Sequence, residues 1–113
     1  MKTESFAILT LDRFNKCLEL MVGQKNQEYS RNDDKLHNFK VAGRIKNETP
    51  EKALWGMYIK HLVSVMDMIG DLDSGKLPNI EALWEKITDS INYLMLLEGL
   101  ITERLVDPVT LED

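Results

Sequence analysis

The chain has 113 residues, of which 43% are hydrophobic and 29% charged, and its formal net charge is −5. This length favours one domain over residues 1–113, and the hydrophobic share excludes an intrinsically disordered chain. We expect neither a membrane span nor a signal peptide, and the single cysteine, Cys17, excludes an internal disulfide framework and favours a reducing cytoplasm.

The first expected elements are an N-terminal arm over residues 1–10 and a helix over about residues 11–27. The arm holds a short apolar segment that could be a strand or an extended stretch packed on the core. In the helix, apolar residues recur at the i, i+3, i+4, i+7 spacing of one face. These residues are Leu11, Phe14, Leu18, Met21 and Val22.

A polar, locally basic loop is expected over residues 24–48. Its cations are Lys25, Arg31, Lys35, Lys40, Arg44 and Lys46, against Glu28, Asp33 and Asp34. Basic residues beside aromatic ones in an acidic protein favour an anionic ligand, with phosphate the first candidate. The alternative is a solvated loop that Tyr29 and Phe39 pin to the core. A weak apolar pattern allows a short helix over about residues 35–46, unless a second subunit supplies the fourth helix.

Two longer helices follow, and both have clear start signals. Thr49 and Pro50 suit the N-cap and first position of a helix over about residues 50–71, and Asn79 suits the N-cap of a helix over 80–105. The expected buried stripe of the first is Leu54, Trp55, Tyr58, Leu62, Val65, Met66 and Ile69. The wide apolar face of the second is Leu83, Trp84, Ile87, Ile91, Leu94, Leu97 and Ile101. A C-terminal tail is expected over residues 106–113.

The pattern predicts an all-α fold, an antiparallel bundle of three long helices plus a possible short one. A chain this small can hardly cover such apolar faces alone, so we expect a homo-oligomer, a dimer or higher. Residues 1–66 carry 11 Lys and Arg against 8 Asp and Glu, whereas residues 67–113 carry 3 against 11. The acidic second half argues against binding duplex nucleic acid.

Polar stripes on the two long helices suggest a second kind of site. One stripe holds Lys60, Ser64, Asp67 and Asp71, and the other holds Glu81, Glu85, Asp89 and Asn92. Carboxylates on facing helices can hold a divalent metal, although amphipathic helices also keep such residues toward solvent. His61 is expected at a helix edge or in a hydrogen bond across an interface.

Several short motifs occur in a fixed order over residues 11–105. In chain order they are Lys25-Asn26-x-Glu28-Tyr29, Asp33-Asp34-Lys35-Leu36-x-Asn38-Phe39, Thr49-Pro50-Glu51-x-Ala53-Leu54-x-Gly56-Met57, Lys60-His61-x-x-Ser64 and Glu85-Lys86-Ile87-x-Asp89-x-Ile91-Asn92-Tyr93-Leu94. In these motifs the chain resembles small phage and prophage proteins that carry the nucleotide-modification-associated domain. That family is similar to the all-α nucleotide pyrophosphohydrolases of the MazG-like and dimeric dUTPase-like kinds. The resemblance implies a helical, usually dimeric protein that binds a phosphorylated small molecule.

The resemblance to the enzymes weakens at their magnesium ligands, which are Glu-x-x-Glu on one helix and Glu-x-x-Asp on the next. Asp89 falls at the last Asp, but Lys86 stands three residues earlier and Glu85 is one residue off. Lys60 and Ser64 fall on the helix that should carry the acidic pair. Nucleotide binding with degraded hydrolytic chemistry is therefore implied, and the candidate Mg²⁺ ligands are Asp67, Glu85 and Asp89.

Three functions stay open from the sequence. The first is a phage-type helical protein that acts on or sequesters a free nucleotide in the host cytoplasm. The second is an inhibitor of a host defence system that acts by protein–protein interaction, and the third is an active Mg²⁺-dependent pyrophosphohydrolase. The candidate ligand-binding residues are Lys25, Glu28, Tyr29, Asp34, Lys35, Asn38, Phe39, Lys60, His61, Ser64 and Asn92.

Overall fold

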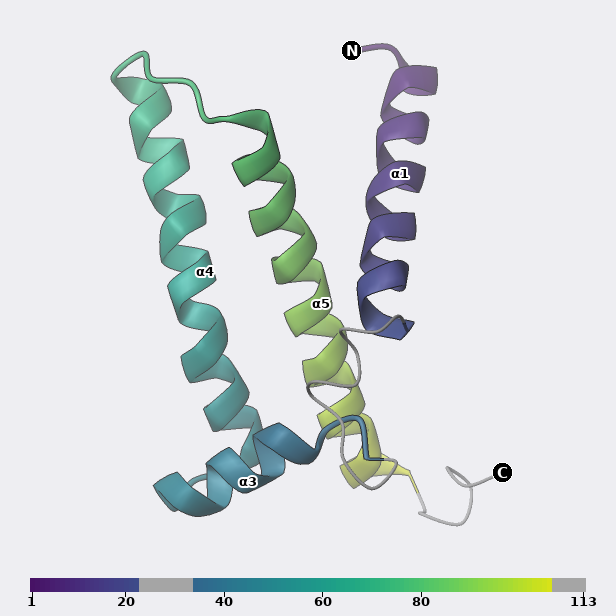
Figure 1. Cartoon of the computed structure of the whole chain (residues 1–113), viewed down its shortest axis with the longest axis vertical. Coiled ribbons are helices and arrows are strands. Elements are labelled where there is room, and N and C mark those ends of the chain that lie inside the picture. The colour runs from purple at the N-terminus through teal and green to yellow at the C-terminus, as the bar shows by residue number, and fades with distance from the viewer. Residues whose placement is uncertain (23–33, 107–113) are drawn as a thin grey trace.

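The computed structural model describes residues 1–22 and 34–106, and its regular elements over these ranges are α-helices (Figure 1). They are α1 (Thr3–Val22), α3 (His37–Lys46), α4 (Pro50–Asp73) and α5 (Ile80–Leu105). The expected all-α fold is confirmed. None of the helices in the described ranges combines the length and the apolarity that a membrane crossing requires.

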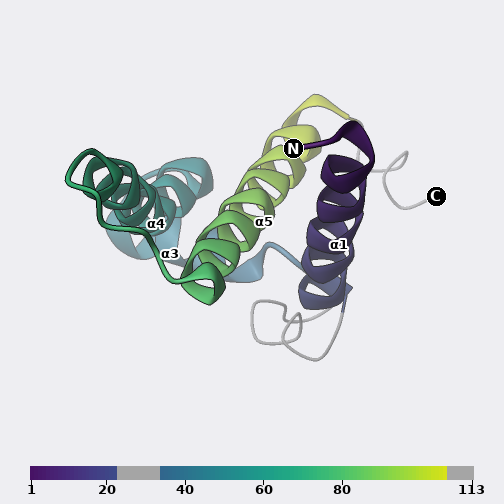
Figure 2. The same ribbon diagram turned by 90° about the horizontal axis from the view of Figure 1, so that it is seen from above.

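The three long helices stand side by side, with α5 between α4 and α1 (Figures 1 and 2). α4 runs antiparallel to α5, as the short connection between them predicts, whereas α1 runs in the same direction as α5. The short helix α3 crosses the foot of α4. Because α5 touches a neighbour on each side, it is the central element of the described structure.

The helix starts lie where the capping residues place them. The Thr49 hydroxyl accepts a hydrogen bond from the Lys52 N–H at 3.2 Å, and Pro50 occupies the first turn. The Asn79 side chain accepts from the N–H groups of Glu81 and Ala82 at 2.8 and 3.2 Å. These bonds satisfy donors that a helix leaves unpaired in its first turn, so α4 and α5 begin at fixed residues.

Replacing Asn79 with alanine should lower the free energy of unfolding by about 1 kcal/mol, because two N–H donors lose their acceptor. Asn15→Ala is the matched control, since Asn15 is exposed inside α1 and caps nothing. Urea denaturation followed by circular dichroism measures both variants. Equal losses would show that the Asn79 cap contributes nothing to stability.

The buried core is small and lies where α3 meets α4 and α5. Its fully buried side chains are those of Phe39 and Leu54, and partly buried residues such as Met21, Met57 and Tyr93 pack around it. The core cluster consists of Leu36, Phe39, Leu54, Leu96 and Leu100. The described core is therefore concentrated in one half of the long helices.

One expectation about the N-terminal region needs correction. Residues 3–10 are neither strand nor extended arm, because α1 begins at Thr3 and the Thr10 hydroxyl donates to the Phe6 carbonyl, as in a helix. Glu4 in the first turn and the helix formers after it extend the helix to that point. Within the expected loop, residues 37–46 form α3, which confirms the expected short helix. Residues 24–33 of that loop and residues 107–113 of the expected tail lie outside the described residues.

The apolar faces are also not buried as expected. α1 packs on α5 through Arg13 and Cys17, while Leu11, Phe14, Leu18 and Val22 stay exposed. The reason is a polar contact: the Arg13 guanidinium donates to the Thr88 hydroxyl at 3.0 Å and lies over Trp84, 5.0 Å from its ring centre. Much of the expected stripe on the other two long helices is exposed too: Trp55, Met66, Ile69, Trp84, Ile87, Leu94 and Ile101.

Candidate functional site

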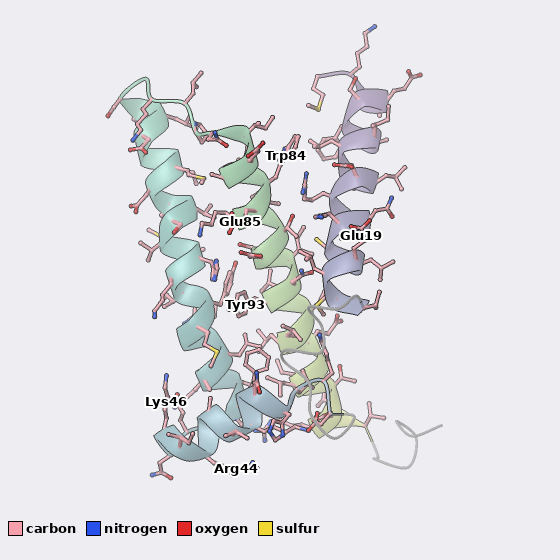
Figure 3. All side chains as sticks on the ribbon, viewed as in Figure 1. Glu19, Arg44, Lys46, Trp84, Glu85 and Tyr93 are labelled. Carbon is pink, nitrogen blue, oxygen red and sulfur yellow. The ribbon has the colours of Figure 1, made fainter. Side chains whose placement is uncertain are left out.

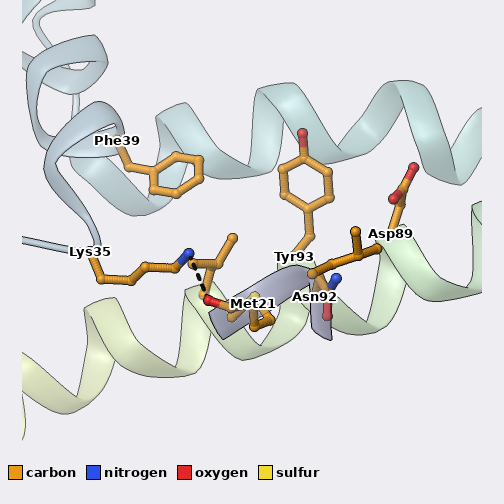
Figure 4. A pocket seen from close by; sticks show the side chains of 8 residues that line it. Met21, Lys35, Phe39, Asp89, Asn92 and Tyr93 are labelled. Carbon is orange, nitrogen blue, oxygen red and sulfur yellow. Dashed lines mark hydrogen bonds between the residues drawn. The ribbon is translucent and has the colours of Figure 1, made fainter. Parts of the chain in front are cut away.

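A small pocket lies where the end of α1, the start of α3 and the middle of α5 come together (Figure 4). Its volume is about 100 Å³, which suits a few water molecules or a small ligand group but not a whole nucleotide. Its lining consists of Leu20, Met21, Lys35, Phe39, Asp89, Asn92, Tyr93 and Leu96. Four predicted site residues, two from residues 35–39 and two from residues 89–92, thus converge here.

Lys35 supplies the cation of the pocket. Its ammonium group donates a hydrogen bond to the Met21 carbonyl at 3.3 Å, drawn as the dashed line in Figure 4. That carbonyl belongs to the last turn of α1, where a positive charge is favourable. Partial burial lowers the pKa of Lys35, because removing water disfavours the charged form. An anion placed beside this ammonium would reverse that effect.

Asp34 holds the turn that carries Lys35. Its carboxylate accepts the Leu36 N–H at 3.0 Å and pairs with the Lys40 ammonium at 2.8 Å, while Lys40 also reaches Glu103 on α5 at 3.0 Å. Burial alone would raise the pKa of Asp34, but the hydrogen bonds from Lys40 and Leu36 lower it. For Lys40 burial would lower the pKa, and its two carboxylate partners raise it. Asp34 is thus a positioning residue between α3 and α5.

Two pocket-lining residues of α5, Asp89 and Tyr93, also lie at the contact between α5 and α4. Tyr93 points toward α4 (Figure 3) and stacks on Tyr58 with ring centres 5.6 Å apart, while the His61 ring lies 5.1 Å from Tyr93. His61 Nδ1 is 3.5 Å from an Asp89 carboxylate oxygen, and this nitrogen has no hydrogen-bond partner among the described residues. His61 thus lies at the contact between α4 and α5 and approaches Asp89 there without forming the expected hydrogen bond.

Asn92 presents a buried polar atom to the pocket. Its side-chain oxygen is shielded from solvent and has no hydrogen-bond partner within the described ranges, and His61 Nδ1 shares this condition. Buried polar atoms in folded proteins are nearly always paired with protein, water or ligand. Since Asn92 lines the same pocket as Lys35 and Asp89, a ligand group that donates a hydrogen bond would gain a contact with this amide oxygen.

A larger groove opens next to the pocket, between α1 and the first half of α5. Its volume is about 720 Å³, and it shares Leu20 and Asp89 with the pocket. Glu81, Glu85, Lys16 and Trp84 also line it, and Figure 3 labels Trp84 and Glu85 near the upper end of α5. The pocket and the groove together have the size that small-molecule sites usually have.

The two predicted polar stripes do not face each other. Lys60 and Asp67 are exposed on α4, and the Ser64 hydroxyl donates to the Lys60 carbonyl within the same helix at 3.2 Å. Asn38 is exposed on α3. Glu85 borders the groove, and Asp89 borders both groove and pocket. Lys25, Glu28 and Tyr29 lie outside the described residues.

The tentative metal ligands do not form a cluster. Across residues 1–22 and 34–106, no three His, Cys, Asp or Glu side chains gather closely enough to hold a metal ion. Of the tentative ligands, Glu85 and Asp89 both border the groove, whereas Asp67 is exposed and lines neither the groove nor the pocket. Since Mg²⁺ requires near-octahedral oxygen coordination, the described side chains do not supply a magnesium site by themselves.

Sequence reasoning missed the contribution of α1 to this region. Arg13 and Cys17 are buried against Thr88, and the Cys17 sulfur lies 3.9 Å from the Thr88 carbonyl. Burial raises the pKa of the Cys17 thiol, which makes it a packing residue and not a nucleophile. The sequence does contain a signal for this face of α1. Thr10, Arg13, Cys17 and Leu20 are spaced as one helical face, but that face is mixed in polarity.

The chain was also compared with known proteins. Neither protein-family models, nor curated proteins, nor solved structures gave a match.

Proposed function

We propose that the chain is a helical nucleotide-binding protein that acts on or sequesters a free, phosphorylated nucleotide. The observation that supports this most directly is the convergence of Lys35, Phe39, Asp89 and Asn92 on one pocket. These residues come from the turn before α3, from α3 and from α5, and all of them belong to the motifs that resemble the nucleotide-modification-associated family. A solvated surface loop would not require such convergence.

The two parts of the site suit different parts of a nucleotide. In the pocket, the Lys35 ammonium would bind a phosphate oxygen, and its partial burial strengthens that attraction relative to a fully solvated lysine. In the groove, Glu81 and Glu85 would repel phosphate but could accept hydrogen bonds from the amino groups of a base. The nucleotide would thus lie with its phosphate in the pocket and its base in the groove.

We expect Mg²⁺ to bind only together with the nucleotide. Glu85 and Asp89 both border the groove, and a cation bound to the phosphates could use their oxygens. Hydrolysis is the weaker alternative, because the described residues offer no complete set of metal ligands. Pyrophosphate release in the presence of Mg²⁺ would establish that alternative.

A titration calorimetry screen of nucleoside mono-, di- and triphosphates, with and without Mg²⁺, tests the proposal. We expect saturable binding of at least one phosphorylated nucleotide and no turnover. The unphosphorylated nucleoside should bind much more weakly, since the proposed contact is with phosphate. Absence of binding across the whole panel would contradict the proposal.

Lys35→Ala should weaken nucleotide binding at least about tenfold, because a charge-assisted hydrogen bond to phosphate is lost. Lys76→Ala is the matched control, since Lys76 is exposed in the loop between α4 and α5 and pairs only loosely with Asp71 at 3.8 Å. Calorimetry on both variants, after circular dichroism has confirmed their fold, gives the comparison. Equal affinities for the two variants would remove Lys35 from the site.

The protonation of Lys35 offers a second readout of the same contact. Burial holds its pKa below the usual value, and a bound phosphate would raise it again. Nucleotide binding at alkaline pH should therefore take up protons, which calorimetry in buffers of different ionisation enthalpy detects. Lys35→Ala should abolish this uptake.

An inhibitor of a host defence system is the second candidate function. It is supported by the long apolar side chains that the described helices leave exposed, among them Phe6, Phe14, Trp55 and Met66. Such a protein would bind another protein and show no response to any nucleotide. The calorimetric screen therefore separates the two functions.

We also propose that the chain is a homo-oligomer. The same exposed apolar surface supports this, because a monomer of this size rarely leaves so many large hydrophobic side chains in water. Light scattering coupled to size-exclusion chromatography measures the mass directly. A monomer at micromolar concentration would contradict it.

A further inference from the structure

One row of residues on α5 repeats with the spacing of a coiled coil. It begins at Ile80 and ends at Leu105, and its steps alternate between four and three residues. Between these ends it passes through Trp84, Ile87, Ile91, Leu94, Glu98 and Ile101. A period of 3.5 residues with apolar a and d positions is the pattern of a helix that packs along its whole length against another helix. We call this row the α5 seam.

The α5 seam is not buried inside the chain. The buried residues of α5 are Thr88, Leu96 and Leu100, which lie on other sides of the helix. On the seam itself Leu94 is 49% exposed and Leu105 is 79% exposed. The second half of this face is therefore left open by α1 and α4, whereas in the first half the Arg13 side chain of α1 lies over Trp84.

The whole chain exposes more surface than a compact monomer of its mass. The accessible surface is 8564 Å². A compact monomer of this mass exposes about 6,300 Å² by the usual scaling of surface with size. The excess of roughly 2,200 Å² per chain leaves room for a standard interface, in which each partner buries roughly 800 Å².

A second copy of this chain would fit the α5 seam in an antiparallel orientation. The only polar position of the seam is Glu98, at an a position. In a parallel, in-register pair two Glu98 carboxylates would face each other, whereas a two-fold axis near the seam centre separates them by about 16 Å along the helix. In that orientation Glu98 of each copy faces the Ile87 region of the other.

The antiparallel orientation also uses a groove beside the seam. An apolar groove of about 510 Å³ lies between α1 and the first half of α5, with Phe6, Phe14 and Trp84 among its walls. The second half of α5 has no α1 alongside it in Figure 1. Antiparallel pairing would lay this second half, with Leu94 and Ile101, along the groove of the other copy.

We propose that two copies of the chain form a two-fold dimer through antiparallel pairing of their α5 seams, with the apolar groove that Phe6 and Phe14 line in each copy receiving the second half of the other α5. The proposal rests on the proposed self-association and adds its surface and orientation. The phosphate pocket of the candidate nucleotide site involves Lys35, Asp89 and Asn92, which are not seam positions, whereas Trp84 lies both on the seam and in the groove proposed for the base. The dimer would therefore leave the phosphate pocket open and border the groove at Trp84.

Leu94→Glu tests the surface, and Val63→Glu is its matched control. Both residues are 49% exposed, but Val63 lies two positions after His61 and so points away from α5. Sedimentation velocity should give a dimer for the parent chain and for Val63→Glu. Leu94→Glu should weaken dimerisation at least about a hundredfold, because it places a carboxylate against the partner's seam near its centre.

Glu98→Leu provides a variant with the opposite expected effect. Removing the one polar residue from a coiled-coil seam should tighten the dimer at least about tenfold. Because this change adds apolar surface at an exposed position, it should leave the fold of the single chain intact. An unchanged or weaker dimer would overturn the assignment of the seam.

Cysteine cross-linking tests the orientation. Cys17 is buried, so Ile80→Cys and Leu105→Cys would each carry one accessible thiol. After the two variants are mixed and oxidised, antiparallel pairing should give a disulfide between the two different chains. Disulfides only between identical chains would show a parallel pair and overturn the proposal.

The sedimentation results for the parent chain and the two glutamate variants each decide a different point. A monomeric parent chain would overturn both the seam and the proposed self-association. A dimer that survives Leu94→Glu would overturn the seam alone, and dissociation by Val63→Glu instead would place the interface on the outer face of α4. Nucleotide binding is measured separately, so its failure would not affect this result.

Discussion

Replacing Phe39 with alanine is expected to lower the free energy of unfolding by about 3–5 kcal/mol. Phe39 is only 2% exposed and lies at the centre of the small cluster formed with Leu36, Leu54, Leu96 and Leu100. Removal of the ring would leave a cavity at the point where α3, α4 and α5 meet. Since small domains have total stabilities of about 5–15 kcal/mol, the loss should be visible as a large shift of the urea midpoint.

Two further variants separate the packing role of Phe39 from its predicted role in ligand binding. Phe39→Leu keeps most of the volume and should cost less than about 1.5 kcal/mol. Ile45→Ala, on the same helix at a position that is 79% exposed, should cost little. If Phe39→Leu folds normally but binds nucleotide more weakly, the ring acts as a pocket wall as well. Equal losses for Phe39→Ala and Ile45→Ala would disprove the core assignment.

The parts of the fold that depend on local chemistry were predictable from the sequence. Thr49-Pro50 and Asn79 mark helix starts because capping requires only neighbouring backbone N–H groups. The existence of α3 followed from a weak apolar pattern within an otherwise polar stretch. The start of α1 was not predictable in the same way, because the first residues lack a comparable cap signal and their apolar segment also fits a strand.

The buried faces were not predictable, because periodicity does not identify the neighbour that covers a face. The apolar row of α1 is regular, yet α1 meets α5 through Arg13 and Cys17. The guanidinium of Arg13 is stabilised there by Thr88 and by the Trp84 ring, a contact between residues that are far apart in the sequence. An apolar row left exposed by one chain is what a partner would cover, and a single sequence does not say which chain supplies that partner.

The candidate site shows the same limit: spacing tells which residues share a face of a helix, but not which way that face points. Spacing placed Lys60, Ser64 and Asp67 on one side of α4, and that relation within the helix is sound. However, α4 turns His61 toward Asp89 on α5. One position along a helix changes the direction of a side chain by about 100°, so Lys60 points to solvent. The α5 residues Asp89 and Asn92 reach the pocket because α5 is central and meets neighbours on two sides.

Replacing Gly43 with alanine is expected to lower the free energy of unfolding by about 1–3 kcal/mol, although alanine is the better helix former. A Cβ at this position would lie 2.8 Å from the Glu48 carbonyl oxygen, 3.0 Å from the Pro50 nitrogen and 3.1 Å from the Thr49 carbonyl carbon. All three are backbone atoms of the short connection between α3 and α4, and the Glu48 N–H also donates to the Gly43 carbonyl at 2.9 Å. The connection cannot move away without breaking this bond.

Gly70→Ala is the matched control. It separates the close approach of the backbone at Gly43 from the general effect of replacing a helical glycine with alanine. Gly70 lies inside α4, and a Cβ there would meet nothing within 4 Å. That change should therefore stabilise the protein by about 0.5–1 kcal/mol, through helix propensity alone. Urea denaturation of the two variants should give shifts of opposite sign. If Gly43→Ala also stabilises, α3 does not approach the start of α4 this closely, and the position of Phe39 over the pocket would have to be explained by other contacts.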